Sequence, residues 1–312
     1  MKSVTNRTIL FMGTPYFAQV VLRSLINEGY KIIAVVTQPD KPVGRKHQLE
    51  QSPVKELARQ SQLPVFQPLK IREDYQFIID INPDLIITCA YGQIIPSVII
   101  SNYLCINIHA SLLPELRGGA PMHRAIMNGR QQTGITLMKM AKKMDDGDII
   151  IQESVDITLE DTVSSLQEKL IDCACRMLEK NLPLIVEDRI PSHPQDHSLA
   201  TFGYNISKDD EFISFQRPYM TVYNHIRALI SWPIGYGIIK DQKIKLHGVC
   251  YSDLPTDEPD GTLIGLVDNQ IQIAVEHRII GITQLQVEGR NIVSATDFMN
   301  GLGKQLINQR FK

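Results

Sequence analysis

An amide and an imidazole stand two positions apart at the end of an apolar stretch of the chain. Asn107 and His109 alternate with Ile106 and Ile108, so in a β-strand their side chains point to the same side. An amide donates hydrogen bonds and an imidazole exchanges protons, and open α/β sheets place their sites at the carboxyl ends of parallel strands. The alternative is a capped strand end, in which both side chains satisfy backbone groups of the following loop.

A second candidate is the acidic segment at 144–148, which reads Met-Asp-Asp-Gly-Asp. Its carboxylates, Asp145, Asp146 and Asp148, flank a glycine, a composition typical of a turn between strands. An EF-hand is excluded, because the segment is too short and lacks the distal glutamate. Taken alone, the segment is better interpreted as a solvated turn without a function.

Two further features depart from the cofactor and metal motifs that they resemble. Gly13-Thr14-Pro15 follows the first apolar run, but it supplies one glycine of G-x-G-x-x-G and lacks the P-loop lysine, so we expect no NAD. Cys173 and Cys175 have no second cysteine or histidine pair at ligand spacing, so we expect no metal. The five cysteines are an odd number, which favours a reduced cytosolic chain with buried thiols.

These candidates need elements that position them, and the first half of the chain alternates strand and helix signals. Residues 18–25 place apolar side chains on one helical face, and Ser52 followed by Pro53 marks a helix start. A later helix is expected to open at Thr158 and Asp161 and to end near Pro183 or soon after. Strands are expected at the apolar runs 8–12, 31–37, 84–90, 104–108, 134–140 and 148–155. The alternation predicts an α/β fold, with a Rossmann-like, mostly parallel doubly wound sheet.

The pattern changes after residue 189. Residues 190–208 are rich in proline, glycine and polar residues and are expected to form a linker or an extended crossover. A helix is expected at 220–230, and short strands at 237–239, 244–251, 262–267, 271–275 and 279–287. Five short strands with turns favour a smaller, OB-like C-terminal β-barrel. The predicted domains are therefore 1–189 and 209–312, joined by the linker 190–208.

Length and composition fit a globular protein. The chain has 312 residues, of which 43% are hydrophobic and 21% are charged, close to the globular average. Its apolar runs are too short to cross a bilayer, no secretory signal is present, and a net charge of −2 excludes a strongly basic nucleic-acid coat. We therefore expect a cytoplasmic protein without a membrane partner. Because no partner stripe is evident, we expect a monomer.

Several segments together resemble the methionyl-tRNA formyltransferases, a family that depends on 10-formyltetrahydrofolate. The resemblance spans nearly the whole chain and rests on residues 11–18, 37–45, 52–55, 90–92, 107–114, 117–121, 133–136, 144–148, 207–209, 226–228 and 232–233. Asn-x-His with Ser-Leu-Leu-Pro and the acidic turn is shared with formyltransferases that act on small amines. The loop Thr-Gln-Pro-Asp-Lys-Pro-x-Gly-Arg and Trp232-Pro233 point to the tRNA enzymes.

The resemblance implies a catalytic role for Asn107, His109 and Asp145. The implied reaction moves a formyl group from 10-formyltetrahydrofolate, a co-substrate, to the α-amino group of methionine on initiator methionyl-tRNA, for the initiation of translation. The implied folate-binding residues are Ser111, Leu112, Leu113, Pro114, Tyr91 and Gly92. The implied tRNA-binding residues are Lys41, Arg45 and Lys46. The alternatives are core packing for the two leucines and a solvated surface for the basic loop.

Such a reaction passes through a tetrahedral oxyanion, to which the Asn107 amide and a protonated His109 would donate. Asp145 would keep His109 charged and assist proton transfer. A covalent route through Cys105 is the alternative, but a thiol inside an apolar strand lacks an activating base. Two other functions stay open at this point: formyl transfer to a small amine such as an amino sugar, and non-catalytic binding of folate or RNA.

Overall fold

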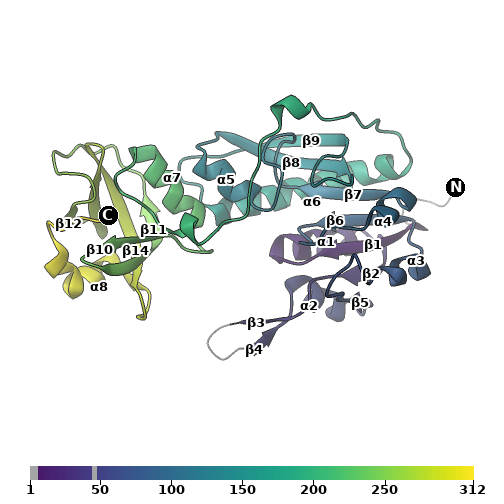
Figure 1. Ribbon diagram of the computed structural model, residues 1–312, viewed down its shortest axis with the longest axis horizontal. Helices are drawn as coiled ribbons and strands as arrows, with labels where there is room; N and C mark the ends of the chain where they lie inside the picture. The colour runs from purple at the N-terminus through teal and green to yellow at the C-terminus, as the bar shows by residue number, and fades with distance from the viewer. Residues whose placement is uncertain (1–5, 44–47) are drawn as a thin grey trace. The chain divides into compact units, whose positions relative to one another are not determined.

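The computed structural model describes residues 6–43 and 48–312, and within them the chain forms two compact units (Figure 1). The first unit contains the chain up to Pro121 together with Thr133–Val155 and Gln167–Gly203. The second unit contains Met122–Gln132, Asp156–Leu166 and Tyr204–Lys312. Each unit therefore draws on more than one stretch of the chain.

The first unit is built on a mostly parallel sheet with the strand order β5-β2-β1-β6-β7-β8-β9. Its strands are β1 (Thr8–Gly13), β2 (Lys31–Val36), β5 (Val65–Phe66), β6 (Leu85–Cys89), β7 (Cys105–His109), β8 (Gln132–Lys139) and β9 (Ile149–Asp156). Strands β5, β2, β1, β6 and β7 are parallel, and β8 is antiparallel to β7. This order is that of a doubly wound sheet, which confirms the predicted Rossmann-like fold.

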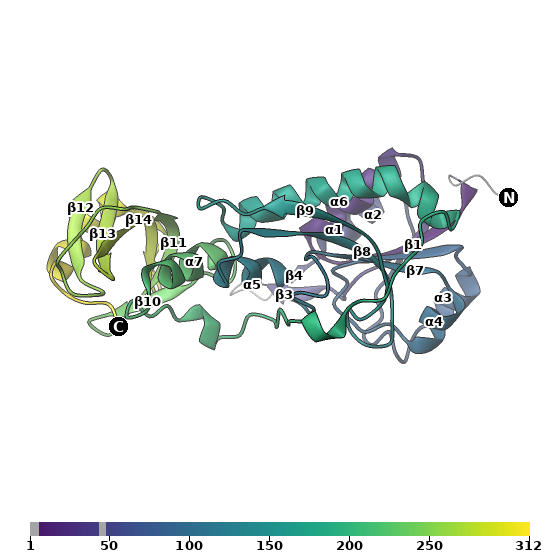
Figure 2. The same ribbon diagram turned by 90° about the horizontal axis from the view of Figure 1, so that it is seen from above.

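Helices cover both faces of this sheet. They are α1 (Tyr16–Asn27), α2 (Pro53–Gln60), α3 (Gln76–Ile81), α4 (Ser97–Asn102) and α6 (Val163–Val186). Figure 2 shows α1, α2 and α6 on one face, and α3 and α4 on the other. Helix α2 begins as predicted, because the Ser52 hydroxyl accepts from the Lys55 backbone N–H at 3.1 Å. Among the described residues, no helix combines the length and apolar character needed to cross a bilayer.

The second unit holds an antiparallel sheet with the order β10-β11-β14-β13-β12, and β15 pairs with β14. Its strands are β10 (Tyr236–Ile239), β11 (Gln242–Cys250), β12 (Leu263–Val267), β13 (Gln270–Val275), β14 (Arg278–Val287) and β15 (Val293–Ser294). The helices α5 (Pro121–Met127), α7 (Tyr219–Leu229) and α8 (Ala295–Asn300) accompany them. Phe311 pairs with Ile239 of one edge strand, and Arg310 pairs with Thr262 beside the other. The C-terminal residues thus bridge both edges of the predicted β-domain.

Two stretches that the sequence predicted as a loop and a linker form backbone pairs of the β type. The polar stretch after β2 forms an antiparallel hairpin of β3 (Lys41–Val43) and β4 (Gln48–Glu50). The stretch 190–203 runs along the first unit, where His193 bridges to Ile149 of β9 and Phe202 bridges to Arg117. Short 3-10 helices are η2 (His197–Leu199), which lies within this stretch, and η3 (Asp209–Glu211) and η4 (Leu302–Leu306), which lie further along the chain.

A bidentate ion pair stabilises the second unit. Both terminal nitrogens of Arg124, on α5, donate to the Asp210 carboxylate at 2.8 Å. Ser207 donates to the same carboxylate through its backbone N–H and its hydroxyl, at 2.8 and 2.9 Å. The hydrogen bonds from Arg124 hold the pKa of Asp210 well below its usual value of 3.8. With the two side chains only 20% and 24% exposed, the pair should contribute more than a solvated surface pair.

We predict that Arg124→Ala lowers the free energy of unfolding of this unit by about 1.5–3 kcal/mol at pH 7, because the carboxylate loses its charged donor. The contribution of the pair is present above the usual pKa of Asp210 and is lost as the pH falls through the lower pKa of the folded state. The difference between wild type and variant should therefore be constant above about pH 5 and shrink below about pH 3.8.

Urea unfolding between pH 3 and pH 7 measures this difference. The matched control in the same unit is Lys312→Ala, which removes an exposed ion pair with Asp241 and should change the free energy of unfolding by less than about 0.5 kcal/mol. Equal destabilisation by the two variants would contradict the prediction.

Candidate active site

The two polar residues of β7 lie at the carboxyl edge of the parallel sheet. In the strand register, Asn107 is opposite Thr88 of β6, and Thr88 is opposite Met12 of β1. Asn107 is therefore level with the next-to-last residues of two central strands, and His109 is the final residue of β7. Asn107 is half-buried, whereas His109 is only 6% exposed. The structure thus has both side chains at the end of a strand, as the sequence predicted.

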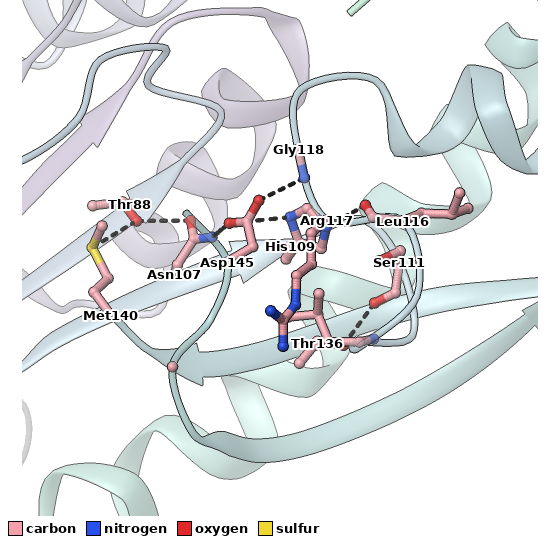
Figure 3. Close-up of polar contacts among 12 residues, drawn as sticks. Thr88, Asn107, His109, Ser111, Leu116, Arg117, Gly118, Thr136, Met140 and Asp145 are labelled. Atoms are coloured by element: carbon pink, nitrogen blue, oxygen red, sulfur yellow. Dashed lines mark hydrogen bonds and ion pairs between the residues drawn. The ribbon is translucent and has the colours of Figure 1, made fainter. Parts of the chain in front are cut away.

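The Asp145 carboxylate joins these two side chains, as Figure 3 shows. Its Oδ1 accepts a hydrogen bond from Asn107 Nδ2 at 3.3 Å and lies 3.7 Å from His109 Nδ1. Its Oδ2 accepts from the backbone N–H of Gly118 at 2.8 Å. The fold therefore brings together the three residues that the sequence analysis assigned to catalysis, although Asp145 lies 36 positions after His109.

The His109 ring lies between two acceptors. Opposite the Asp145 carboxylate, His109 Nε2 lies 3.1 Å from the carbonyl oxygen of Leu116. The Leu116 carbonyl can only accept, so a ring protonated on Nε2 satisfies this contact, while Nδ1 lies within ion-pair distance of the Asp145 carboxylate. The expected donation from His109 to an oxyanion therefore competes with these protein acceptors. Among the described contacts, the Asn107 amide keeps one N–H without a protein partner, which makes it the available donor.

Thr88 fixes the orientation of this amide, and the sequence analysis did not single it out. The Thr88 hydroxyl donates to Asn107 Oδ1 at 2.8 Å, so that Asn107 Nδ2 faces Asp145 (Figure 3). Thr88 is 3% exposed within the apolar strand β6. A lone hydroxyl in an otherwise apolar central strand is the signal that could have identified it, because a buried hydroxyl needs a partner.

The acidic turn has a backbone that holds Asp145 in place. Asp145 has a φ of +52°, the left-handed region that aspartate tolerates better than most residues. A Cβ at Gly147 would overlap the carbonyl oxygen of Lys139, so only glycine fits where the turn packs against the end of β8. The Lys139 N–H in turn donates to the Asp148 carbonyl at 2.9 Å. The segment is thus an ordered turn against the sheet edge, not the solvated turn that its composition favoured.

Tyr91 and Gly92 occupy the end of β6. The Tyr91 ring is buried in the core, and burial raises the pKa of its hydroxyl. The Tyr91 carbonyl accepts from Thr14 Oγ1 and from Gln38 Nε2, both at 3.0 Å. Ala90 and Gly92 are exposed and have left-handed φ values of +45° and +86°. At this strand end the exposed surface is therefore that of Ala90 and Gly92, whereas the tyrosine side chain is buried.

The segment 111–114 is tied into the first unit by internal contacts. The Ser111 hydroxyl donates to the Glu115 carbonyl, and the Ser111 carbonyl accepts from Thr136 Oγ1, both at 2.6 Å. Leu113 is 3% exposed and packs in a cluster with Met138 and Ile149. Leu112 and Pro114 are half-buried. Core packing thus accounts for Leu113.

The predicted tRNA-binding residues are only partly described. Lys41 is exposed on β3, whereas Arg45 and Lys46 lie outside the described residues. At the base of the hairpin, Lys55 Nζ donates to Asp40 at 2.6 Å, which lowers the pKa of the Asp40 carboxyl below its usual value. Among the described residues, Lys55 thus supplies the positive charge that pairs with Asp40.

The thiol alternative is disfavoured by burial. Cys105 is 4% exposed, and desolvation raises the pKa of its thiol to about 12, so the nucleophilic thiolate is scarce at neutral pH. All five cysteines are free. In residues 6–43 and 48–312, no group of three or more histidine, cysteine, aspartate or glutamate side chains is arranged to hold a metal ion.

Comparison with solved structures places this fold among known proteins. A variant of HypX from Aquifex aeolicus superposes with a TM-score of 0.69 at 15% identity, covering 96% of this chain and 48% of that one. WlaRD, a sugar 3N-formyl transferase, superposes with a TM-score of 0.66 at 19% identity, covering 91% and 99% of the two chains. At such identities the likeness shows the fold alone.

Comparison of sequences is more specific. The model of the Formyl transferase family matches residues 6–182, and that of its C-terminal domain matches residues 205–303. A methionyl-tRNA formyltransferase from Bacillus mycoides is 44% identical over 299 residues, which cover 94% of this chain and 95% of the relative. One from Halalkalibacterium halodurans is 44% identical over 303 residues, 96% of each chain. With both family domains and near full-length identity to these relatives, the chain belongs to the formyltransferase family, among the methionyl-tRNA formyltransferases.

Proposed function

We propose that this chain transfers the formyl group of 10-formyltetrahydrofolate to the α-amino group of methionine on initiator methionyl-tRNA. The observation that carries the proposal is the 44% identity to methionyl-tRNA formyltransferases along nearly the whole of both chains. The clustering of Asn107, His109 and Asp145 at the sheet edge supports it, because formyl transfer needs donors and a proton acceptor at one place.

The reaction sets four requirements. The unprotonated methionine amine forms a bond to the formyl carbon, and the bond between that carbon and N10 of the folate breaks. The amine nitrogen loses a proton, and N10 gains one. Between these events the formyl oxygen carries negative charge. The protein must therefore stabilise an oxyanion and move one proton.

Each residue of the cluster fits one of these requirements. The free N–H of Asn107 is the donor for the oxyanion, a contribution of roughly 3–4 kcal/mol for one such donor. The His109 imidazolium supplies positive charge beside it. Asp145 balances that charge, and its carboxylate is the group that accepts a proton as the amine attacks.

The folate fits the exposed backbone at the end of β6. Ala90 and Gly92 offer backbone groups of the kind that pair with a flat, hydrogen-bonding pterin. We assign Tyr91 and the segment Ser111 to Pro114 to the same site as the resemblance implies, with Leu112 and Pro114 as the partly exposed members of that segment.

The tRNA is assigned to the hairpin and to the second unit. Lys41, Arg45 and Lys46 provide positive charge for phosphate contacts, and the Asp40 carboxylate beside them in the sequence is paired with Lys55. We further propose that the protein acts as a monomer in the cytoplasm, where translation initiates, without a membrane partner.

The first experiment measures formyl transfer from 10-formyltetrahydrofolate to methionine-charged initiator tRNA, with free methionine and an amino sugar as parallel acceptors. We expect transfer to the charged tRNA alone. Transfer only to the amino sugar would keep the catalytic cluster and refute the assignment of the acceptor. No transfer to any acceptor would favour a binding protein.

Within the catalytic cluster, His109→Ala and Asp145→Ala should each lower kcat by at least ~10²-fold, because each removes charge stabilisation at the reacting atoms. Binding of the folate, measured by calorimetry, should change little. His193→Ala is the control, because it removes an exposed imidazole of the same unit. Wild-type turnover in either cluster variant would exclude the mechanism.

For the hairpin, replacing Lys41, Arg45 and Lys46 by alanine should raise KM for the charged tRNA about tenfold or more and reduce its salt dependence, because phosphate contacts are lost. KM for the folate should stay within about twofold. Lys70→Ala removes an exposed lysine paired with Glu73 and serves as the control. An unchanged salt dependence in the triple variant would count against the hairpin as a phosphate-binding element.

A further inference from the structure

A buried glutamine connects the turn that carries Asp145 to a buried arginine. Gln195 Nε2 donates to the backbone carbonyls of Asp145 and Gly147, at 2.9 and 2.7 Å. Gln195 Oε1 accepts from Nε and Nη2 of Arg117, at 3.1 and 2.7 Å. Both hydrogens and both acceptor positions of the amide are in use, and the residue is 5% exposed. The four partners leave this amide a single orientation.

Arg117 extends the connection to the next residue of the turn. Its guanidinium pairs with the Asp146 carboxylate, and the side chain is 7% exposed. The neighbouring residue, Gly118, donates its backbone N–H to the Asp145 carboxylate at 2.8 Å. Figure 3 shows Arg117 and Gly118 beside the contact between His109 and Asp145. The turn is therefore held through its backbone by Gln195 and through its side chains by Arg117 and Gly118.

Gln195 is itself anchored independently of the catalytic strand. It belongs to the stretch 190–203, whose flanks pair with the first unit at His193 and Phe202. No described contact joins Gln195 to Asn107 or His109. The polar character of this stretch predicted a linker, but one of its residues reaches the backbone of the acidic turn.

We propose that Gln195 is a positioning residue for formyl transfer, which acts by holding the left-handed backbone of Asp145 so that its carboxylate meets His109 and Asn107. The inference rests on the proposed function, because its main effect is read in formyl transfer. The tip of the turn at 142–144 is exposed, so its placement depends on few contacts. A displacement of the reacting groups by about 1 Å lowers the rate by about 10²-fold.

The test uses Gln195→Glu in the full-length protein. Glutamate keeps the size of the side chain and still accepts from Arg117, but its carboxylate cannot donate to the two carbonyls. We expect kcat for formyl transfer to fall about 10- to 100-fold, with KM for both substrates within about threefold. Ser198→Ala is the control in the same stretch, since its hydroxyl contacts the exposed Asp196, and it should behave as wild type.

A double-mutant cycle shows whether Gln195 acts through Asp145. In an Asp145→Asn background, Gln195→Glu should lower single-turnover transfer by less than about twofold, because the residue through which it acts has lost its charge. The proposal would be overturned if the two substitutions together lowered the rate by the product of their separate effects. It would also be overturned by a wild-type kcat in Gln195→Glu, or by an effect of this variant on KM alone.

Amide hydrogen exchange supplies a readout that does not depend on activity. The amides of Gly118 and Lys139, which donate to the Asp145 carboxylate and to the Asp148 carbonyl, should exchange faster in Gln195→Glu, while those of β7 keep their protection. Unchanged exchange at these two amides would overturn the inference, as would equal loss of protection in β7, which indicates a general loss of structure. Gln195→Met, neutral and of similar length, repeats the measurement without an added charge. If the wild-type protein formylates no tRNA, the proposed function fails, whereas the exchange experiment still decides the role of Gln195 in the turn.

Discussion

The Asp145 carboxylate, nearly buried, is the constraint on which the geometry of the first unit depends. Its side chain is 12% exposed, and a charge removed from water must be surrounded by donors. Gly118 and Asn107 donate hydrogen bonds, and His109 lies close enough to form an ion pair. These groups belong to β7 and to the loop after it, whereas Asp145 follows β8. The pairing of β7 with β8 brings the two segments together, and the close contact of Gly147 with β8 folds the turn back beside β7.

Most of the fold could be predicted, because its strands are apolar runs bounded by turn residues. The central strand expected at 84–90 is β6 (Leu85–Cys89), and the C-terminal strand expected at 279–287 is β14 (Arg278–Val287). The hairpin at Lys41–Glu50 was missed because short polar strands carry no periodic signal. Helix α6 begins at Val163, later than expected, because Asp161 accepts from the backbone N–H of Thr158 within a preceding turn. A capping pattern does not distinguish such a turn from the helix itself.

The candidate site could be predicted only in part, because sequence patterns relate residues that are close along the chain and not residues that the fold brings together. Asn107 and His109 share a strand face through a period of two, which local sequence reports. Asp145 was joined to them only by family resemblance, since no local rule pairs residues 36 positions apart. Gln195 was not identified because a polar residue in a polar, proline-containing stretch gives the same sequence pattern whether it is solvated or buried on backbone carbonyls. Thr88 was not identified as a site residue because one hydroxyl does not alter the sequence pattern of an apolar strand.

Two non-glycine residues of the first unit have a strained backbone that contacts within the protein hold in place. Ala90 at the end of β6 and Asp145 both have positive φ values, which cost about 1–3 kcal/mol for each non-glycine residue. The strain persists because neighbouring contacts fix it: Thr14 and Gln38 bind the carbonyl next to Ala90, and Gln195 and Gly118 bind Asp145. In the proposed reaction, donors held in advance need no rearrangement as the oxyanion forms. Electrostatic stabilisation is largest under that condition, so the contacts that fix Asp145 before the reaction serve the proposed formyl transfer.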